Sequence, residues 1–165
     1  MGESSTEECD SSSIEIIPAI SKDIESIASI LRESFPGKAK YYKIRSWEHE
    51  SKKILRSDKG WITFVAVDRG EVAGVIAARH LKTKYPTVRV EWIAVAEPFR
   101  NRGIGKALFD HLTKWITCSF FNQQVRITLR ARTDVQDFYR KLGLRCYGRG
   151  WMKKRVSKQN NEASA

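Results

Sequence analysis

The sequence lacks several features that would place it in other classes of protein. No run of about 18 apolar residues occurs, so no segment is long enough to span a membrane as a helix. The three cysteines are odd in number, irregularly spaced and without a C-x-x-C pair, which supports neither a disulfide framework nor a zinc site. Because no secretory signal is recognisable, we expect a cytoplasmic protein, with the nucleus left open.

Acidic residues are scarce after the first 35 positions. The formal charge of the 165 residues is +11 at pH 7. Residues 1–35 carry a net charge of −6, whereas residues 36–165 carry +17. A basic body suits an anionic partner. Nucleic acid, the ribosome or an acidic protein fits that description, and so does a basic surface that is only solvated.

The composition predicts one folded domain between two short tails. Residues 1–13 are rich in serine and acid, lack apolar periodicity and are expected to be disordered. Residues 14–156 form the expected domain, and residues 157–165 form a polar tail. Met1 to Thr6 fits the loose N-myristoylation pattern, with Cys9 as a candidate second lipid site. The nearby acids disfavour an anionic membrane surface, and lipidation stays open.

The segment from Val90 to Ile116 is the most informative part of the chain. It runs from an apolar strand through a proline-containing turn into Arg100-x-x-Gly103-x-Gly105, and then directly into an amphipathic helix. Glycines let consecutive backbone N–H groups approach a pyrophosphate. The start of the helix adds unpaired N–H groups and the positive end of its dipole. This order predicts a phosphate-binding loop.

Two familiar phosphate-binding motifs do not fit this loop. A P-loop requires glycine where Arg100 stands, and serine or threonine where Ala107 follows Lys106. The dinucleotide fingerprint requires a third glycine where Leu108 stands. The ligand is therefore a different phosphate compound.

Hydrophobic periodicity predicts an order of β-α-α-β-β-β-α-β-α-β-β. We expect Ser21 to cap the first helix and Gly143 to end the last one. In the long helix, Asp110 and Lys114 should form an i,i+4 pair outside the apolar face. The expected strands are 14–18, 61–67, 72–81, 88–95, 125–129, 144–147 and 151–156. The expected helices begin near 21, 47, 104 and 135. The expected apolar face of the long helix is Ile104, Ala107, Leu108, Leu112, Trp115 and Ile116.

The loop resembles the acyl-CoA site of the GCN5-related N-acetyltransferase (GNAT) superfamily. That signature is Gln or Arg, two residues, Gly, one residue, then Gly or Ala, between the fourth strand and the third helix; Arg100, Gly103 and Gly105 match it. Residues 137–144, D-F-Y-R-K-L-G-L, are similar to the family's Phe-Tyr-x-Lys-x-Gly-Phe segment, with Leu144 in place of the final Phe. The element order over residues 14–156 is also the family's order.

The resemblance implies an α/β (α+β) GNAT fold. Its mixed, mostly antiparallel sheet has about seven strands, is flanked by four helices and is splayed between strands 4 and 5. Acetyl-CoA would lie in that splay as co-substrate. Backbone N–H groups near Ile93, Ala94 and Val95 would bind its acyl carbonyl and pantetheine. The loop residues implied in binding are Arg100, Asn101, Arg102, Gly103, Ile104, Gly105 and Lys106. No cluster of His, Cys or carboxylate has metal spacing, so no metal is expected.

Two residues are candidates for proton transfer in acetyl transfer to an amine. Tyr139, in the family-like segment, would protonate the leaving thiolate; otherwise it is an aromatic of the apolar helix face. Glu91 interrupts an apolar strand, where burial would raise its pKa, and is the candidate base, directly or through water. Strand periodicity places Glu91 on the face of Ile93 and Val95. The alternatives are an ion pair of Glu91 with Arg89 or Arg79, and His80 as the base.

The resemblance implies an acetyl-CoA-dependent N-acetyltransferase that acts by direct attack in a ternary complex, because no positioned Cys or Ser nucleophile suggests a covalent intermediate. The acceptor is a primary amine of a protein, a peptide or a small molecule. The basic and aromatic segment from Lys38 to Arg45 would border the acceptor site and favour acceptors with a nearby negative charge. A non-catalytic acyl-CoA-binding or acidic-partner-docking module remains the alternative, as does nucleic-acid docking. The protein is expected to be a monomer or a homodimer.

Overall fold

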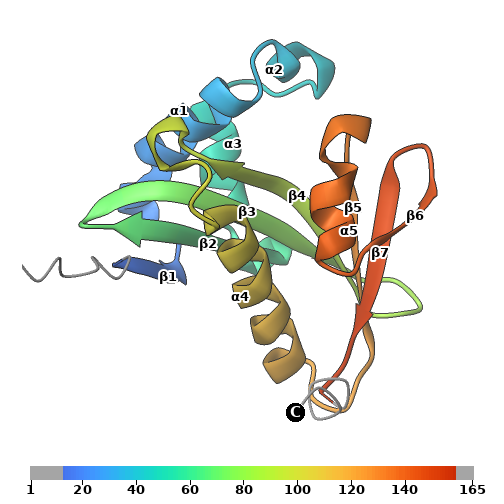
Figure 1. Cartoon of the computed structure of the whole chain (residues 1–165). Coiled ribbons are helices and arrows are strands. Elements are labelled where there is room, and N and C mark those ends of the chain that lie inside the picture. The colour runs from blue at the N-terminus through green and yellow to red at the C-terminus, as the bar shows by residue number, and fades with distance from the viewer. Residues whose placement is uncertain (1–12, 159–165) are drawn as a thin grey trace, which may run out of the picture.

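Seven strands join into one mixed sheet in the order β1-β2-β3-β4-β5-β7-β6 in the computed structural model, which describes residues 13–158 (Figure 1). All neighbouring strands are antiparallel except β4 and β5, which are parallel. The strands are β1 (Ile14–Pro18), β2 (Trp61–Asp68), β3 (Glu71–Leu81), β4 (Thr87–Val95), β5 (Val125–Arg130), β6 (Arg145–Gly148) and β7 (Trp151–Val156). Most of both expected tails, with Cys9 and the myristoylation pattern, lies outside the described residues.

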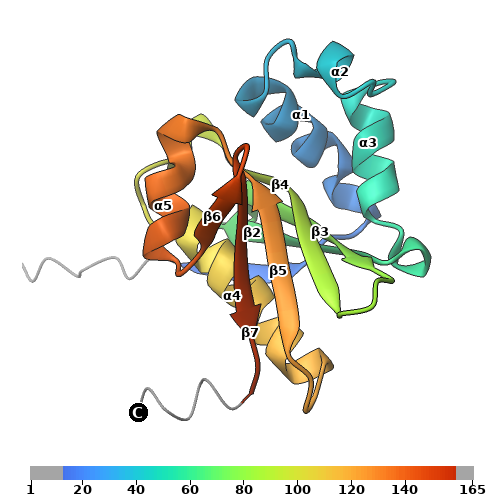
Figure 2. The same cartoon turned by 90° about the vertical axis from the view of Figure 1, so that its right-hand side faces the viewer.

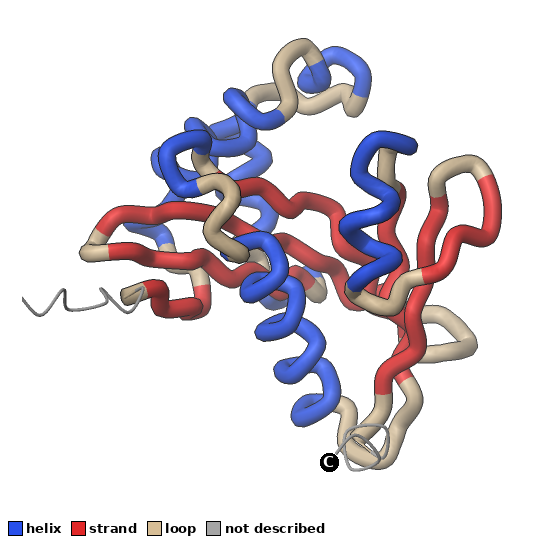
Figure 3. The backbone as a smooth tube through the Cα atoms, in the orientation of Figure 1, coloured by secondary structure: helices blue, strands red, loops and turns tan. Residues whose placement is uncertain are grey.

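The four expected helices are present, together with the single-turn helix α2, which was not expected. They are α1 (Ile24–Ser34), α2 (Lys38–Tyr41), α3 (Trp47–Ile54), α4 (Ile104–Ser119) and α5 (Gln136–Lys141). Helices α1 and α3 cover one face of the N-terminal half of the sheet, and α4 covers the other face (Figure 3). No helix within residues 13–158 is long and apolar enough to cross a membrane. The expected α+β architecture is confirmed.

The start of α1 differs from the prediction. Ser21 does not cap the helix but begins a 3₁₀ turn that runs to Asp23 and leads into Ile24. The side chain of Asp23 accepts a hydrogen bond from the backbone N–H of Ile20 at 2.8 Å. Asp23 thus supplies the carboxylate that stabilises the helix start, because it lies close to the positive end of the helix dipole.

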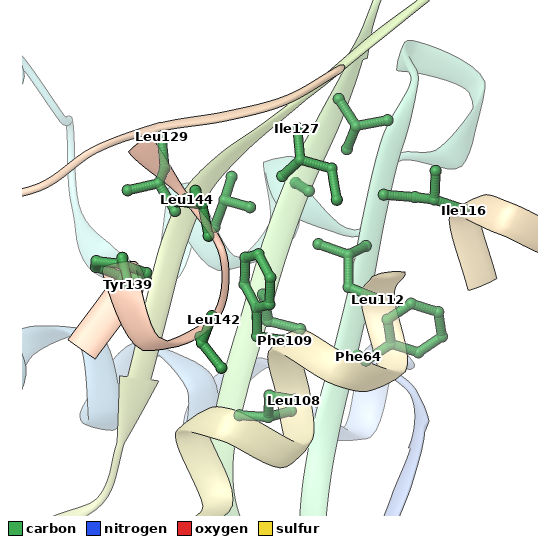
Figure 4. Packing of buried hydrophobic residues seen from close by; sticks show 14 of the residues in the cluster. Phe64, Leu108, Phe109, Leu112, Ile116, Ile127, Leu129, Tyr139, Leu142 and Leu144 are labelled. Atoms are coloured by element: carbon green, nitrogen blue, oxygen red, sulfur yellow. The ribbon is translucent and has the colours of Figure 1, made fainter. Parts of the chain in front are cut away.

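The helix α4 packs through a face slightly rotated from the predicted one. Phe109 was not expected in the core, yet it is 1% exposed, whereas Trp115 is 37% exposed at the edge. Figure 4 shows Phe109 between Leu112 and the side chains of the C-terminal strands. The expected pair of Asp110 with Lys114 is also wrong. Asp110 instead accepts a hydrogen bond from Lys106, one turn earlier, at 2.6 Å.

A glycine on β3 allows α4 to lie close to the sheet. A Cβ atom on Gly74 would stand 3.0 Å from the carbonyl oxygen of Ala94, 3.2 Å from Leu108 and 3.3 Å from Ile104. Such distances are shorter than ordinary van der Waals contact. Gly74 therefore sets the depth at which the first turn of α4 docks on β3 and β4.

The parallel pairing of β4 with β5 covers only a short part of β4. Thr87, Val88 and Arg89 lie opposite the segment 126–128, and the pairing stops there. The remainder of β4, from Val90 to Val95, has no strand partner on this side. Figure 1 shows β4 and β5 diverging beyond this point, with α5 beside the gap. The splay expected between strands 4 and 5 is therefore confirmed.

Candidate functional site

A cavity of about 990 Å³ occupies the splay between β4 and β5. One wall is the free part of β4 from Val90 to Val95, and the opposite wall runs from Leu129 to Thr133. The remaining wall residues come from the end of α1, from α2, from the loop before α4, from α5 and the turn before it, and from the β6–β7 turn: Ser34, Phe35, Lys38, Tyr41, Tyr42, Arg100, Val135, Gln136, Tyr139, Arg149 and Gly150. Segments far apart in the sequence thus meet around one space.

The predicted phosphate-binding loop lies at one end of the free part of β4. Asn101 and Gly103 have positive φ angles of 63° and 75°, so the backbone turns sharply into α4. The first backbone bond of the helix is donated by Ala107 to the carbonyl of Gly103. The N–H groups of Ile104 and Gly105 precede this bond and have no helical partner. This geometry fits a bound pyrophosphate, because oriented amides and the helix dipole both favour an anion.

The basic side chains of the loop have partners within the protein. The Nε of Arg100 donates to the carbonyl of Val95 at 3.0 Å. Arg102 is paired with Asp68 at 3.0 Å. Lys106 is paired with Asp110. The loop therefore offers an anion its backbone amides, whereas its cationic side chains already have partners within the protein.

Gly105 brings the loop close to the family-like segment of α5. A Cβ atom at Gly105 would stand 3.5 Å from the ring of Phe138 and 3.9 Å from Val95, both ordinary contacts. Phe138 in turn packs edge to face against Tyr139, with ring centroids 5.1 Å apart. The two motifs recognised separately in the sequence are therefore in contact in the fold.

Tyr139 lines the cavity while most of its side chain is in the core. It is 8% exposed, and Figure 4 places it beside Leu142 and Leu144 at one end of the hydrophobic cluster. Burial raises the pKa of Tyr139 to about 12, because the phenolate would lose hydration. The phenol is consequently protonated over the neutral and moderately alkaline range, as a proton donor requires.

Glu91 also lines the cavity, but not in the way strand periodicity predicted. The register of β3 on β4 shifts at this residue, with Ala77 opposite Trp92 and Ala78 opposite Val90, so Glu91 is the extra residue of a β-bulge. Val90 packs in the core beside α4, as does Ile93 after the bulge. The expected alternation that placed Glu91 with Ile93 and Val95 is therefore interrupted.

The carboxyl group of Glu91 has no ion-pair partner among residues 13–158, which argues against the predicted pairs with Arg89 and Arg79. The side chain of Glu91 borders the cavity, and the surrounding protein excludes part of the water that would hydrate its carboxylate. This desolvation raises the pKa of Glu91 above 4.5, although the positive charges of Arg89, Lys53 and Arg79 oppose the rise.

Sequence reasoning missed a second carboxylate near the site. Glu50 on α3 is 5% exposed. It accepts a hydrogen bond from Nε1 of Trp92 at 3.1 Å and pairs with Lys53 at 3.2 Å. The negative charge of Glu50 also raises the pKa of Glu91. The signal was weak, because Glu50 lies in a helix that also carries the exposed acid Glu48.

Aromatic rings line the cavity where β4 meets the end of α1 and α2. Trp92 packs against Phe35, Tyr42 and Trp47 with ring centroids 5.2 to 5.4 Å apart. The ammonium of Lys38 lies 5.9 Å from the ring centroids of both Phe35 and Tyr42. The basic and aromatic segment predicted to border the acceptor site therefore lies at the cavity.

His80, the alternative base, lies elsewhere. It lines a separate cavity of about 480 Å³ with Trp61 and Phe120, whose ring centroid is 5.0 Å from that of His80. Neither Glu91 nor Tyr139 lines that cavity. Within residues 13–158, no group of three or more His, Cys, Asp or Glu side chains could hold a metal ion.

Comparison with known proteins places this geometry in context. The profile of the acetyltransferase (GNAT) family matches residues 24–144. No curated protein sequence matches the chain.

Solved structures share the fold at low sequence identity. NAA60 of Arabidopsis thaliana, in complex with a bisubstrate analogue, has a TM-score of 0.67 and 18% identity, and the match covers 88% of this chain and 98% of that one. An aminoglycoside 6′-N-acetyltransferase complexed with coenzyme A has a TM-score of 0.69 and 18% identity, covering 86% and 96%. PaiA N-acetyltransferase of Thermoplasma acidophilum, in complex with coenzyme A, has a TM-score of 0.67 and 20% identity, covering 87% and 99%.

Proposed function

The chain belongs to the acetyltransferase (GNAT) family, and from this we propose that it transfers an acetyl group from acetyl-CoA to a primary amine of a protein, a peptide or a small molecule. One observation carries the proposal: the free part of β4, Arg100 at the start of the loop and the side chain of Tyr139 all line the same cavity. A donor bound along β4 would have its phosphates at the loop and its thioester near Tyr139.

The free part of β4 suits the pantetheine arm of the donor. Beyond Arg89 the strand has no partner on the side of β5, so its backbone groups are available to the amides of an extended ligand. Backbone groups of Ile93, Ala94 and Val95 would hold the arm and the acyl carbonyl. The amides of Asn101, Arg102, Gly103, Ile104, Gly105 and Lys106 would hold the pyrophosphate, with Arg100 keeping the turn closed through Val95.

The reaction proceeds by direct attack in a ternary complex. The amine nitrogen forms a bond to the thioester carbonyl carbon, negative charge develops on the carbonyl oxygen, and the carbon–sulfur bond then breaks. The thiolate takes a proton from Tyr139, and the amine loses one to Glu91, directly or through water. Neither Cys118 nor Cys146 lines the cavity, which agrees with a mechanism without an acyl-enzyme.

The raised pKa of Tyr139 suits this role. A phenol with a pKa of about 12 is a weak acid for a thiol of ordinary pKa near 8.5 in water. The thiolate, however, would form next to the same apolar walls, and the loss of hydration raises its pKa too. The pKa values of the phenol and of the thiol therefore remain comparable inside the cavity.

Thiol release tests the proposal. The full chain is incubated with acetyl-CoA and a library of amines that includes peptide α-amines, lysine, polyamines and aminoglycosides, and free thiol is measured over time. Amine-dependent release that Tyr139→Phe strongly reduces supports the proposal. Tight binding of coenzyme A without release on any amine would instead identify a non-catalytic acyl-CoA-binding module.

A further inference from the structure

The sheet face opposite α4 is open over β5 and β7. The odd-numbered residues of β5 from Val125 to Leu129 pack in the core beside α4. Because strand residues alternate, Arg126, Thr128 and Arg130 point to the other face. Figure 2 looks onto this face, where β5 and β7 lie in front of α4 and no helix lies in front of them.

Cations occupy neighbouring positions across this face. On β7, Met152 and Val156 are in the core, so Lys153 and Arg155 share the open face with Arg126. Arg155 lies directly opposite Arg126, and Lys153 lies opposite Thr128. On the other side of β5, Arg89 lies opposite Thr128. We call these five cations the basic sheet face: Arg89, Arg126, Arg130, Lys153 and Arg155.

Three of the five cations lie against aromatic rings. The guanidinium of Arg89 lies 5.0 Å from the ring centroid of Trp151. The guanidinium of Arg126 lies 5.7 Å from that of Tyr85. The ammonium of Lys153 lies 4.9 Å from that of Tyr147. Such contacts orient a cation while leaving its N–H edges free for a partner.

No acid inside the described part of the chain forms an ion pair with these cations. None of the ion pairs within residues 13–158 includes a member of the basic sheet face. Like charges placed opposite each other on adjacent strands are destabilising. The Nε atoms of Arg89 and Arg126 and the hydroxyl of Thr128 are also buried without a hydrogen-bond partner. The clustering of cations that lack ion pairs within the described residues points to an anionic ligand.

The basic sheet face continues into the reaction cavity. Arg130, the last residue of β5, belongs to the face and also lines the cavity with Glu91 and Tyr139. Arg149, in the turn between β6 and β7, lines the same cavity. A chain bound on the face can therefore extend past Arg130 to the site of acetyl transfer.

We propose that the basic sheet face binds the acidic side chains of a polypeptide acceptor whose amine enters the cavity. This inference rests on the proposed function for the role of the amine. A polypeptide fits better than a nucleic acid for two reasons. First, a polypeptide carries an aliphatic amine. Second, nucleic-acid bases stack on free ring faces, whereas the rings of Trp151 and Tyr85 already face cations. Carboxylates accept paired hydrogen bonds from the exposed edges of arginine.

Fluorescence anisotropy without acetyl-CoA tests the binding step by itself. The probe is a short peptide with a free N-terminal amine, several glutamates and a C-terminal fluorophore, and its match has glutamine at each glutamate. We expect the full chain to bind the acidic peptide at least about tenfold more tightly at low salt, with the difference shrinking as salt rises.

The variant with Arg126→Glu and Arg155→Glu should lose this preference. The control, Lys22→Glu with Lys114→Glu, changes the net charge equally at exposed positions on other elements and should keep it. Because Arg126 is half-buried, circular dichroism checks that the variant folds, and the pair Arg126→Gln with Arg155→Gln repeats the test without charge reversal.

Three outcomes would overturn the inference: equal binding of the two peptides, equal losses in variant and control, or tighter binding of a single-stranded RNA oligomer than of the acidic peptide. The proposed function is tested separately, by thiol release. Acidic-peptide binding without thiol release from acetyl-CoA would leave the basic sheet face as a docking surface and remove the reaction.

Discussion

The Nη1 atom of Arg102 lies 3.0 Å from Oδ2 of Asp68, joining the phosphate-binding loop to the hairpin of β2 and β3. The other oxygen of Asp68 accepts a hydrogen bond from Ser13 at 2.8 Å. Two segments distant in sequence are therefore fixed to one buried carboxylate. The loop geometry depends on this contact as well as on its glycines.

Replacing Asp68 with asparagine should destabilise the fold in a pH-dependent way. Hydrogen bonds from Ser13 and then Arg102 lower the pKa of Asp68 below 3.8. A group with a lowered folded-state pKa stabilises the protein above its unfolded pKa, and this contribution is lost as pH falls through the folded value. Urea unfolding should show a deficit at pH 7 that shrinks well below 3.8. Asp110→Asn, at an exposed carboxylate on α4, is the control, and an equal deficit at both pH values would contradict the expectation.

Tyr139→Phe should reduce kcat by about 10²-fold, as loss of a general acid does. It removes only a hydroxyl, so urea unfolding should confirm a nearly unchanged stability. Because burial raises the pKa of Tyr139 to about 12, the proposed activity of the unsubstituted protein should show no alkaline decline from this residue below pH 11, roughly one unit beneath that pKa. An unchanged kcat in the variant would remove Tyr139 from the mechanism.

Glu91→Gln should abolish the acidic limb of the kcat/KM profile. A base must be deprotonated to act, so activity falls as pH drops through its pKa, which desolvation places above 4.5. The limb should therefore occur at higher pH than for an exposed glutamate. Glu71→Gln, at an exposed position of the β2–β3 hairpin, should retain the limb. If Glu91→Gln retained it as well, another group or solvent would be the base.

Gly74→Ala should cost about 1–3 kcal/mol of unfolding free energy, the usual range for overpacking. The added methyl group would stand 3.2 Å from Leu108 and 3.3 Å from Ile104, so α4 must shift away from the sheet, and the carbonyl of Ala94 on β4 would be 3.0 Å away. Gly105→Ala is the matched control, since its methyl group would meet Phe138 at 3.5 Å, and it should change stability by less than about 0.5 kcal/mol. Urea unfolding measures both, and equal costs would show that α4 does not depend on Gly74.

The elements with local causes were predictable from the sequence. Runs of β-branched and apolar residues indicated the long strands, alternation indicated the first one, and the glycine pattern indicated the loop before α4. These features depend on residues that are neighbours in the sequence. Gly70, with a φ angle of 81°, suits the turn between the strands expected at 61–67 and 72–81. Gly103 likewise has a φ of 75°, which suits glycine at the start of α4.

The features that escaped prediction depend on partners distant in sequence. The bulge at Glu91 arises from the register of β4 on β3 and leaves no mark on the sequence of β4. The buried state of Glu50 follows from Trp92, 42 residues later. Likewise, Arg102 meets an acid 34 residues earlier. Such pairings become visible only when the strands are placed side by side.

The short pairing of β4 with β5 divides the sheet into two units joined over Thr87 to Arg89. A donor lying along the free part of β4 would act as an inserted strand and connect the two units. Hydrogen exchange should then be fast for unpaired amides of this part in the free chain and slower when acetyl-CoA is present. The ligand would in this sense complete the secondary structure of the protein that binds it.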